Sequence, residues 1–438
     1  MKRTRARWFF PVVAVMATLT GCEAILGLDD ERARTPDAGS VSPPELDGAA
    51  APDAAPALDA GARLPQDPPW VVASLGNHTC AVGPDRRAFC WGDNAEGQLG
   101  NGTTAVSDRP VFVAPFDDVV DVSAGYTHSC LVRVNGDVYC WGKNDRGQLG
   151  DGTKIDRRAV GMLAMTNARK VGVAGWHTCA ITSIGGVRCW GDGYYGALGD
   201  GAYERRTRYV DVQGLSGVRS LAVGVMHNCA STDQGKVYCW GRAIFGQLGY
   251  LVDGDAGSPD PSDPGSALPV PVPGLTDVLE VAAGEDHTCA VRKSGQVVCW
   301  GRGDYGELGD GQKTGSVVPV VPSNLPFAVH LGAGAFTSCG VVDSTSKIQC
   351  WGQNNFAQLG NGNASLGDGL PSSPVVGLAQ MFRISTGEHS CAWRMDGKLF
   401  CWGRNDLGQV GVGRRTDVEL LPVEVTFPVD AGAVSVDP

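Results

Sequence analysis

The chain has 438 residues, of which 62 are Gly, 26 are Pro and only 19% are charged. Such a composition is typical of many short strands and tight turns and excludes a mainly helical protein. The formal net charge of −11 at pH 7 makes nucleic acid and anionic lipid unfavourable partners.

The first 21 residues have the features of a bacterial lipoprotein signal peptide. Lys and Arg at four of the first seven positions precede an apolar stretch over residues 8–19, which is too short to span a bilayer stably. The stretch ends in Leu-Thr-Gly-Cys at residues 19–22, which resembles a lipobox. We therefore expect acylation of Cys22 and export to the bacterial cell envelope, where the lipid anchor is the only membrane contact. The alternative is an ordinary signal peptide followed by a coincidental cysteine.

Residues 22–69 are predicted to form the lipidated N-terminus and a disordered tether. Residues 23–69 hold 10 acidic and 3 basic residues and have almost no bulky apolar side chains. Such a segment cannot bury enough apolar surface to fold. Cleavage after residue 21 would leave 32 Lys and Arg against 47 Asp and Glu, a net charge of −15, and about half of it lies in this segment. We interpret the segment as a spacer between the membrane and the folded body.

The remainder of the chain contains seven copies of one repeat. A Cys-Trp-Gly triplet recurs at intervals of 49 to 60 residues and is followed each time by a stretch such as DNAEGQLGNG at 93–102. Apolar and β-branched residues alternate over short runs between Gly, Asn and Asp, which predicts four strands per repeat and excludes a helical solenoid. We therefore predict an all-β, seven-bladed β-propeller over residues 70–427 and a C-terminal tail over 428–438. The tryptophans of the triplets, predicted to pack the blades, are Trp91, Trp141, Trp190, Trp240, Trp300, Trp351 and Trp402.

Two segments depart from the regular series. An insertion rich in Asp, Pro, Gly and Ser at about 251–268 lengthens the fourth interval and is expected to project as a loop. The strand over 420–425 has no following repeat, so we expect it to close the ring by packing beside the first repeat near 70–75. The aspartates of the insertion resemble a calcium loop only loosely and lack a proper ligand sequence, which favours a solvated loop and no cofactor. These aspartates are Asp253, Asp255, Asp260 and Asp263.

Fourteen of the 15 cysteines form seven close pairs, and we predict that each pair is a disulfide across a β-hairpin. If Cys130 faces Cys140, the loop is Val134-Asn135-Gly136, and its third position must adopt the left-handed conformation that glycine tolerates. Free core cysteines, and metal ligation together with nearby histidines, are the alternatives. The expected role is stability, at roughly 2–3 kcal/mol per bridge. The pairs are Cys80/Cys90, Cys130/Cys140, Cys179/Cys189, Cys229/Cys239, Cys289/Cys299, Cys339/Cys350 and Cys391/Cys401.

The hairpin loops follow one turn rule in five repeats. The third loop position is Gly136, Gly185, Gly235, Gly295 or Gly397. The first repeat has Arg86 at this position, which weakens the argument there, and the sixth has a four-residue loop, 343–346, that can use a type I turn without a left-handed residue. Cysteines that face each other at a non-hydrogen-bonded position should have Cα atoms ~4.5–5.5 Å apart.

The pattern Gly-x-x-His-Thr-Cys-Ala, followed by Gly-x-Val-x-Cys-Trp-Gly-x-Asn-x-x-Gly-Gln-Leu-Gly, resembles the repeat of the regulator of chromosome condensation family over residues 70–427. The resemblance implies a seven-bladed propeller with a protein-binding face. The family includes a nuclear exchange factor for a small GTPase, a plant ultraviolet-B receptor and a bacterial β-lactamase inhibitor, so membership does not identify the partner. The receptor senses light through Gly-Trp-x-His motifs, and only Gly175-Trp176-His177 is similar here, which argues against a photoreceptor.

Six histidines recur two residues before a cysteine, and Thr337 replaces the seventh. Their distribution around a ring would set them far apart, which favours repeated structural hydrogen bonds over a metal site. The histidines are His78, His128, His177, His227, His287 and His389.

The candidate binding residues are the variable residues just before each histidine position. By the resemblance this turn opens on the binding face, where Tyr, Trp, Met and Phe would form an arc of exposed apolar anchors. The alternative is a set of turn residues tucked into the blades. The candidates are Asn77, Tyr126, Trp176, Met226, Asp286, Phe336 and Glu388.

We predict a monomeric, non-catalytic module that binds an unidentified envelope or extracellular protein, or acts in adhesion, and that binds no nucleic acid. The sequence contains no G-x-S-x-G, H-E-x-x-H, P-loop or dinucleotide-binding motif. The alternative is a propeller enzyme, a hydrolase or lyase acting on an envelope polysaccharide or lactone, with its site in the central channel. Convergent channel carboxylates with perturbed pKa values would favour the enzyme, and an apolar aromatic arc on one face would favour the binding module.

Overall fold

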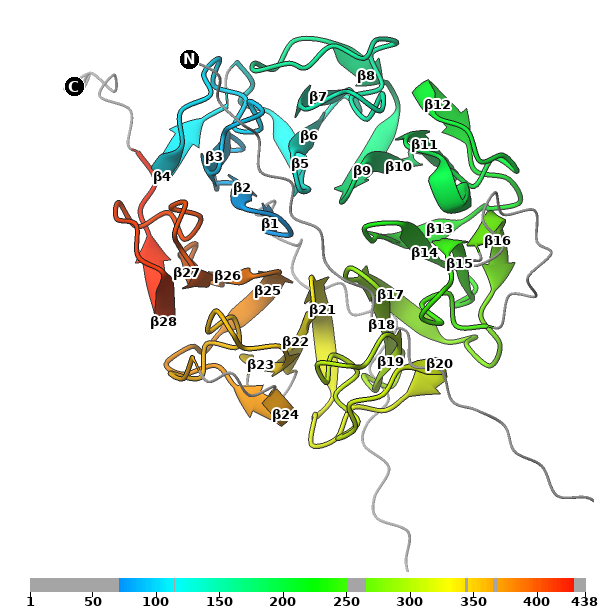
Figure 1. The fold of residues 1–438 in the computed structure, drawn as a ribbon, viewed down its shortest axis with the longest axis vertical. Helices are drawn as coiled ribbons and strands as arrows, with labels where there is room; N and C mark the ends of the chain where they lie inside the picture. The colour runs from blue at the N-terminus through cyan, green and yellow to red at the C-terminus, as the bar shows by residue number, and fades with distance from the viewer. Residues whose placement is uncertain (1–70, 114, 251–264, 343–345, 365–368, 429–438) are drawn as a thin grey trace, which may run out of the picture. The chain divides into compact units, whose positions relative to one another are not determined.

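The computed structural model describes residues 71–113, 115–250, 265–342, 346–364 and 369–428, all within the unit Pro56–Pro438. The whole of Met1–Ala55, including Cys22, lies outside the described residues. The described residues form seven four-stranded antiparallel sheets, one per repeat, arranged around a central axis (Figure 1). The predicted all-β, seven-bladed propeller is confirmed.

Each sheet is one blade, and its four strands follow the chain from the innermost strand to the outermost. Blades 1 and 2 contain β1 (Val71–Ala73), β2 (His78–Val82), β3 (Ala88–Gly92), β4 (Ser107–Phe112), and β5 (Val119–Ala124), β6 (His128–Arg133), β7 (Val138–Gly142), β8 (Leu163–Met165). Blades 3 and 4 contain β9 (Ala168–Val173), β10 (His177–Thr182), β11 (Val187–Gly191), β12 (Arg206–Asp211), and β13 (Val218–Val223), β14 (His227–Thr232), β15 (Val237–Arg242), β16 (Gly265–Pro271). Blades 5 and 6 contain β17 (Val278–Ala283), β18 (His287–Arg292), β19 (Val297–Gly301), β20 (Ser316–Val320), and β21 (Ala328–Gly334), β22 (Thr337–Val342), β23 (Lys347–Gly352), β24 (Gly369–Pro374). Blade 7 contains β25 (Met381–Thr386), β26 (His389–Arg394), β27 (Leu399–Arg404) and β28 (Val418–Val425), and a 3-10 helix, η1 (Tyr194–Gly196), follows β11.

The hydrophobic core lies between neighbouring blades. The middle strands β2 and β6 are buried along nearly their whole lengths because a blade packs on each side of them, whereas the outermost β4 is half-exposed. One core cluster joins Val82 of blade 1 to Val122 and Trp141 of blade 2. Each blade is therefore stable only against its neighbours, as in other repeat proteins. No helix in the described part of the chain is long and apolar enough to cross a membrane.

All seven predicted disulfides are formed, each between the second and third strands of one blade. Cys130 of β6, for example, faces Cys140 of β7 across the hairpin. The bridges are Cys80–Cys90, Cys130–Cys140, Cys179–Cys189, Cys229–Cys239, Cys289–Cys299, Cys339–Cys350 and Cys391–Cys401.

The predicted spacing of the bridged residues was wrong. The Cα atoms are 4.1 Å apart in every pair, below the expected range. The bridge draws together two residues that already face each other at a closely spaced position of the ladder. The same Cα–Cα distance of 4.1 Å separates the third-strand cysteines Cys90, Cys189, Cys239 and Cys350 from their partners Cys80, Cys179, Cys229 and Cys339.

The hairpin loops follow the predicted turn rule in five blades and extend it to the other two. Gly136 has a φ of +85° and donates its N–H to the carbonyl of Arg133 at 2.8 Å. Arg86 occupies the same left-handed region, with a φ of +60°, in blade 1. The expectation that the sixth loop avoids this conformation was wrong, since Ser346 at its end has a φ of +46°. The last loop residue must turn the chain back into a twisted strand, whatever the loop length.

The expected packing of the C-terminal strand beside the first repeat is confirmed by a core cluster that joins Val425 to Val72 and Phe89. β28 pairs with β27 of its own blade, with Val423 opposite Cys401, and not with the first repeat. Blade 7 meets blade 1 through side chains: the indole of Trp91 donates to the carbonyl of Gln409 at 2.9 Å, and Phe427 packs against Phe89 with 5.1 Å between ring centroids. A complete fourth strand satisfies its backbone groups locally, so strand exchange is not needed to close the ring.

The insertion in blade 4 is shorter than predicted. Residues 265–268 belong to β16, where Ser266 pairs with Gly241 of β15, because these backbone groups complete the outer edge of the sheet. Residues 251–264, with the four aspartates of the calcium prediction, lie outside the described residues. Within the described part of the chain, no group of three or more His, Cys, Asp or Glu is placed to hold a metal ion.

Candidate functional site

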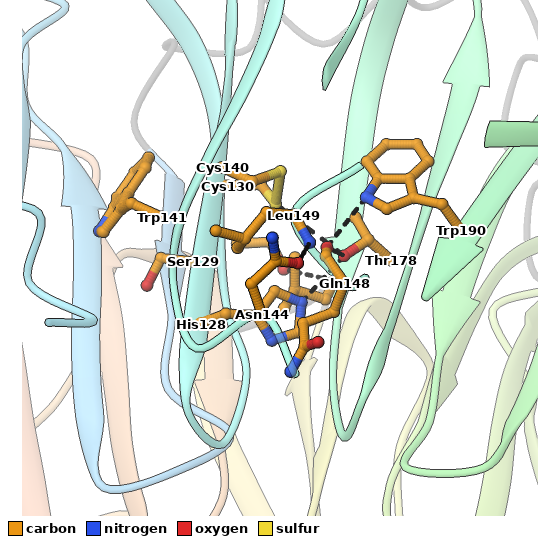
Figure 2. The surroundings of a disulfide bond; sticks show 12 residues. His128, Ser129, Cys130, Cys140, Trp141, Asn144, Gln148, Leu149, Thr178 and Trp190 are labelled. Atoms are coloured by element: carbon orange, nitrogen blue, oxygen red, sulfur yellow. Dashed lines mark hydrogen bonds between the residues drawn. A yellow bond between two sulfur atoms is a disulfide. The ribbon is translucent and has the colours of Figure 1, made fainter. Parts of the chain in front are cut away.

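The repeated His and Trp residues form a latch between neighbouring blades. Figure 2 shows it between blades 2 and 3, where His128 Nε2 lies 2.9 Å from the Thr178 hydroxyl. That hydroxyl and the indole N–H of Trp190 both donate to the backbone carbonyl of Gln148, at 2.9 Å each. Because the threonine hydroxyl donates to the carbonyl, it accepts from the Nε2–H of the histidine. The same indole-to-carbonyl bond joins every pair of adjacent blades.

The latch histidines are neutral and structural. Burial lowers the pKa of His128 to about 3, with small contributions from its histidine neighbours in the ring. The pKa values of His78, His227, His287 and His389 are lowered to about 3 by the same cause. Each histidine bonds a Ser, Thr or Asn side chain of the next blade, which confirms the prediction of repeated hydrogen bonds.

The bridged cysteines belong to the blade cores and not to a surface site. All fourteen are buried, and none lines the two cavities described below. In Figure 2 the bridge between Cys130 and Cys140 lies close to Leu149 and to the latch. The third-strand members, each directly before a latch tryptophan, are Cys90, Cys140, Cys189, Cys239, Cys299, Cys350 and Cys401. Their place in the fold agrees with the predicted role in stability.

The antiparallel order gives the propeller two different faces. The turn between the first and second strands of a blade, and the loop after the third strand, lie at the same end of every sheet. We call this end the turn face, and it carries all seven candidate residues. The other end, with the disulfide-bridged hairpin loops, we call the hairpin face.

The candidate residues do not form the expected arc of exposed anchors. Asp286 is buried and the other six are half-buried. Trp176 lies beside the guanidinium of Arg146 at 5.9 Å, and the ring of Phe336 lies 5.0 Å from the guanidinium of Arg302. In both cases the covering residue belongs to the preceding blade, whose loop after the third strand reaches over the junction.

A ring of cation contacts at the blade junctions was not predicted from the sequence. The residue after a Cys-Trp-Gly triplet meets the loop of the preceding blade, as Lys143 meets Glu96 at 3.1 Å. Asp192 pairs with Arg146 at 2.6 Å in the same way. At three further junctions a guanidinium lies over an aromatic ring, with Arg242 over Tyr195, Arg302 over Phe245 and Arg404 over Phe356. The sequence did carry a signal for these contacts. The residue after each Cys-Trp-Gly triplet and the residue three positions later differ from repeat to repeat, whereas their neighbours are nearly constant.

A cavity of about 370 Å³ opens on the turn face. Its walls come from blades 1, 2, 5, 6 and 7, and it brings together four of the seven candidates, Asn77, Tyr126, Phe336 and Glu388. Trp176, Met226 and Asp286 do not line it. The other charged residues of the walls, which sequence reasoning missed, are Asp93, Glu285 and Arg404.

Carboxylates dominate the electrostatics of this cavity. The Tyr126 hydroxyl hydrogen-bonds Glu285, and burial together with the charges of Glu285, Glu388 and Asp286 raises the pKa of Tyr126. Burial and the neighbouring Asp286 likewise raise the pKa of Glu285. The guanidinium of Arg404 bonds both Glu388 and Asp406.

The central channel contains a second cavity of about 240 Å³. Its two carboxylates are used in bonds between blades: Asp121 accepts the N–H of Val171 at 2.8 Å, and Glu280 pairs with His330 at 2.7 Å. Burial raises the pKa of Asp121, whereas at Glu280 burial is outweighed by His330, Lys170 and Arg383 together, which lower its pKa. The two carboxylates therefore serve blade packing at separate junctions.

Large exposed apolar side chains lie on both faces, with Tyr194 and Ile244 in loops of the turn face and several others on the hairpin face. Ile184, at a hairpin tip, is 90% exposed, and Met395 at another tip is 59% exposed. These loop tips have no neighbouring blade to cover them, in contrast to the seven candidate residues of the turn face.

Comparisons with known proteins agree with this architecture. A family model described as an RCC1-like domain matches residues 27–338, and a model of the regulator of chromosome condensation (RCC1) repeat matches residues 396–437. The ultraviolet-B receptor UVR8 of Arabidopsis thaliana is 38% identical over 160 residues, which are 36% of this chain and 36% of the receptor. The probable E3 ubiquitin-protein ligase HERC6 of Homo sapiens is 33% identical over 176 residues, 38% of this chain and 16% of the ligase.

Solved structures show the same fold at lower sequence identity. Human WBSCR16 is similar with a TM-score of 0.68 and 24% identity, covering 78% of this chain and 95% of that protein. Yeast RCC1 (Prp20), solved with Kap60 bound, has a TM-score of 0.67 and 21% identity, covering 81% of this chain and 85% of that protein. The chain thus spans about a third or less of the two curated relatives, but most of the length of these solved propellers.

Proposed function

Because this chain belongs to the RCC1-like domain family, we propose that it is a non-catalytic propeller that binds a protein partner through its turn face. The observation that carries the proposal is a contrast between the latch residues at the blade junctions and the residues of the turn face. The latch of Trp, Gln and hydroxyl groups is nearly the same at every blade junction, whereas the turn-face residues differ from blade to blade. A constant frame with seven different sets of side chains gives a surface of unique pattern, which selective recognition of a partner requires.

The composition of the turn face supports a polar protein interface. Arg, Tyr, Trp and Phe, the residue types enriched in binding hot spots, recur there. They are half-buried and held by contacts between blades, so little side-chain entropy would be lost on association.

The experiment for this proposal compares one variant on each face. The full chain, purified with its disulfides intact, is used to capture partners from a bacterial envelope extract. A partner captured by the wild type should be lost with Trp176→Ala on the turn face and retained with Ile184→Ala on the hairpin face. A partner that is lost only with Ile184→Ala would place binding on the hairpin face and contradict the proposal.

We further propose that the protein is exported and anchored to the envelope through a lipid on Cys22. The signal-peptide features before Cys22 support this, and so do the seven disulfides, which persist in oxidising compartments and not in the cytosol. Labelled palmitate should be incorporated by the wild type and not by Cys22→Ala. Incorporation into both proteins would contradict the assignment of the anchor.

A further inference from the structure

The turn-face cavity has walls suited to a cation. Tyr126 and Phe336 contribute aromatic rings, whose faces attract organic cations. The charged residues of the walls are three carboxylates, Asp93, Glu285 and Glu388, against one guanidinium, that of Arg404. The negative charge and the aromatic rings favour the same type of ligand.

The guanidinium in the wall pairs with only one of these carboxylates. Arg404 is shared between Glu388 and Asp406, so its charge is already matched. Glu285 forms no ion pair within the described residues, and the bond from the Tyr126 hydroxyl is neutral. The cavity therefore keeps a carboxylate without an ion pair in the described part of the chain, on which the charge of Arg302 acts from beyond contact distance.

Thr127, a residue whose buried hydroxyl has no partner in the described part of the chain, lines the same cavity. The side-chain oxygen of Thr127 is buried and has no hydrogen-bond partner among the described residues. Buried polar atoms nearly always have a partner in folded proteins. Once the Thr127 side chain turns toward the cavity, this oxygen can accept a hydrogen bond from a ligand N–H group.

The other blade junctions of the turn face show where the chain places its own cations. At six blade junctions the chain places one of its own cations against a carboxylate or an aromatic ring. In the cavity Arg302 lies over the ring of Phe336, but Glu285 forms no ion pair with a cation among the described residues. The arrangement is that of a junction whose cation would come from another molecule.

We propose that this cavity binds the ammonium or guanidinium group of a lysine or arginine side chain, presented by the protein partner of the turn face. This inference rests on the function proposed above and specifies its chemistry. Glu285 would accept a charge-assisted hydrogen bond from the cation, Thr127 would accept a second bond, and the two rings would cover its apolar stem. A bare metal ion fits less well, because aromatic rings replace oxygen ligands over part of the wall.

Small probes test the cavity without the partner. Saturation-transfer difference NMR is recorded on the full chain, with its disulfides intact, for N-acetyl-lysine methylamide and N-acetyl-arginine methylamide. The uncharged isostere N-acetyl-norleucine methylamide is the control. At least one cationic probe should bind about tenfold more tightly than the isostere, the effect of one charge-assisted hydrogen bond. The stronger of the two shows whether lysine or arginine is preferred.

Matched variants locate the binding. Glu285→Gln should weaken the cationic probe about tenfold, and Thr127→Val, which keeps the size of the side chain, should weaken it by a smaller factor. Asp117→Asn removes one exposed carboxylate from the loop between β4 and β5 and should leave the affinity unchanged. The thermal unfolding of each variant checks that its fold is intact.

Three results would overturn the inference: equal binding of the norleucine probe, equal loss of affinity with Asp117→Asn, or no binding of either cation. If the probes fail while a partner is still lost with Trp176→Ala, the cation site is wrong and the proposed function stands. If the probes bind as expected but no partner depends on the turn face, the proposed function is wrong and the cation site stands.

Discussion

Replacing Glu307 with glutamine should stabilise the propeller, and more strongly above pH 7 than below pH 5. In five blades the equivalent residue is a glutamine, whose oxygen accepts a backbone N–H and whose amide donates to a nearby oxygen. At Glu307 one carboxylate oxygen accepts the N–H of Tyr305 at 2.8 Å. The other oxygen is buried and has no hydrogen-bond partner within the described residues.

The size of the effect follows from the pKa of this carboxyl. Burial raises the pKa of Glu307 from 4.5 to about 7. The unfolded chain loses this proton near pH 4.5 and the folded chain keeps it until about pH 7, so the free energy of unfolding falls as the pH rises through this window. At ~1.4 kcal/mol per pKa unit, the loss is about 3 kcal/mol and is complete above pH 7.

Glutamine removes this loss because it does not ionise, and its amide has an acceptor at hand. In blade 7, Gln409 donates to the carboxylate of Asp406 at 3.1 Å. Asp304 occupies the matching position in blade 5, where its charge helps to raise the pKa of Glu307. An amide at residue 307 would turn this repulsion into a hydrogen bond.

The assay is guanidinium unfolding, followed by tryptophan fluorescence, at several pH values between about 5 and 8. The difference in unfolding free energy between Glu307→Gln and the wild type should grow across this range, by about 3 kcal/mol over the full titration window. The matched control is Gln409→Glu, which should destabilise blade 7 above pH 7 and recover in acid. A difference for Glu307→Gln that stays constant with pH would refute the reasoning, because Glu307 would then not titrate in this window.

Three further predictions concern the frame of the propeller. Arg86→Gly should raise the unfolding free energy by about 1 kcal/mol, because glycine adopts the left-handed turn without strain, and Arg86→Ala, which keeps the strain, should show no such gain in the same unfolding assay. Replacing Cys289 and Cys299 together by alanine should lower the unfolding free energy by roughly 2–3 kcal/mol, measured with all other disulfides intact; no loss would mean that the bridge does not constrain the unfolded chain. His287→Thr copies the residue of blade 6 and should make the loss of stability in acid less steep. The pKa of His287 is lowered to about 3, so each such histidine removes ~1.4 kcal/mol per pH unit as the pH falls from 6.5 toward 3, and an unchanged slope would show that His287 is not the neutral, buried group described here.

The hairpins were predictable because the information for them is local. Cys130 and Cys140 flank a three-residue loop with a glycine at its end, and this spacing by itself sets the register and the disulfide. The number of blades followed from counting repeats of that unit. The packing of the closing strand was also predictable, because no repeat follows 420–425 and the blade on its other side must then be blade 1.

The candidate residues share one face, as predicted, since equivalent positions of equivalent repeats must lie at the same end of their blades. Their exposure was misjudged because the covering residues come from another repeat. Arg302 lies about 34 residues before Phe336 in the sequence, and nothing within either repeat indicates that their side chains meet.

The sequence alone determined the strands, the seven blades, the disulfides and the constant latch residues, all of which depend on contacts within a repeat or between successive copies. Only the tertiary structure decided which side chains gather in the turn-face cavity, where Tyr126 of blade 2 meets Glu285 of blade 5. The physical reason is that this contact crosses the ring, so it depends on the closure of all seven blades and not on any periodicity along the chain.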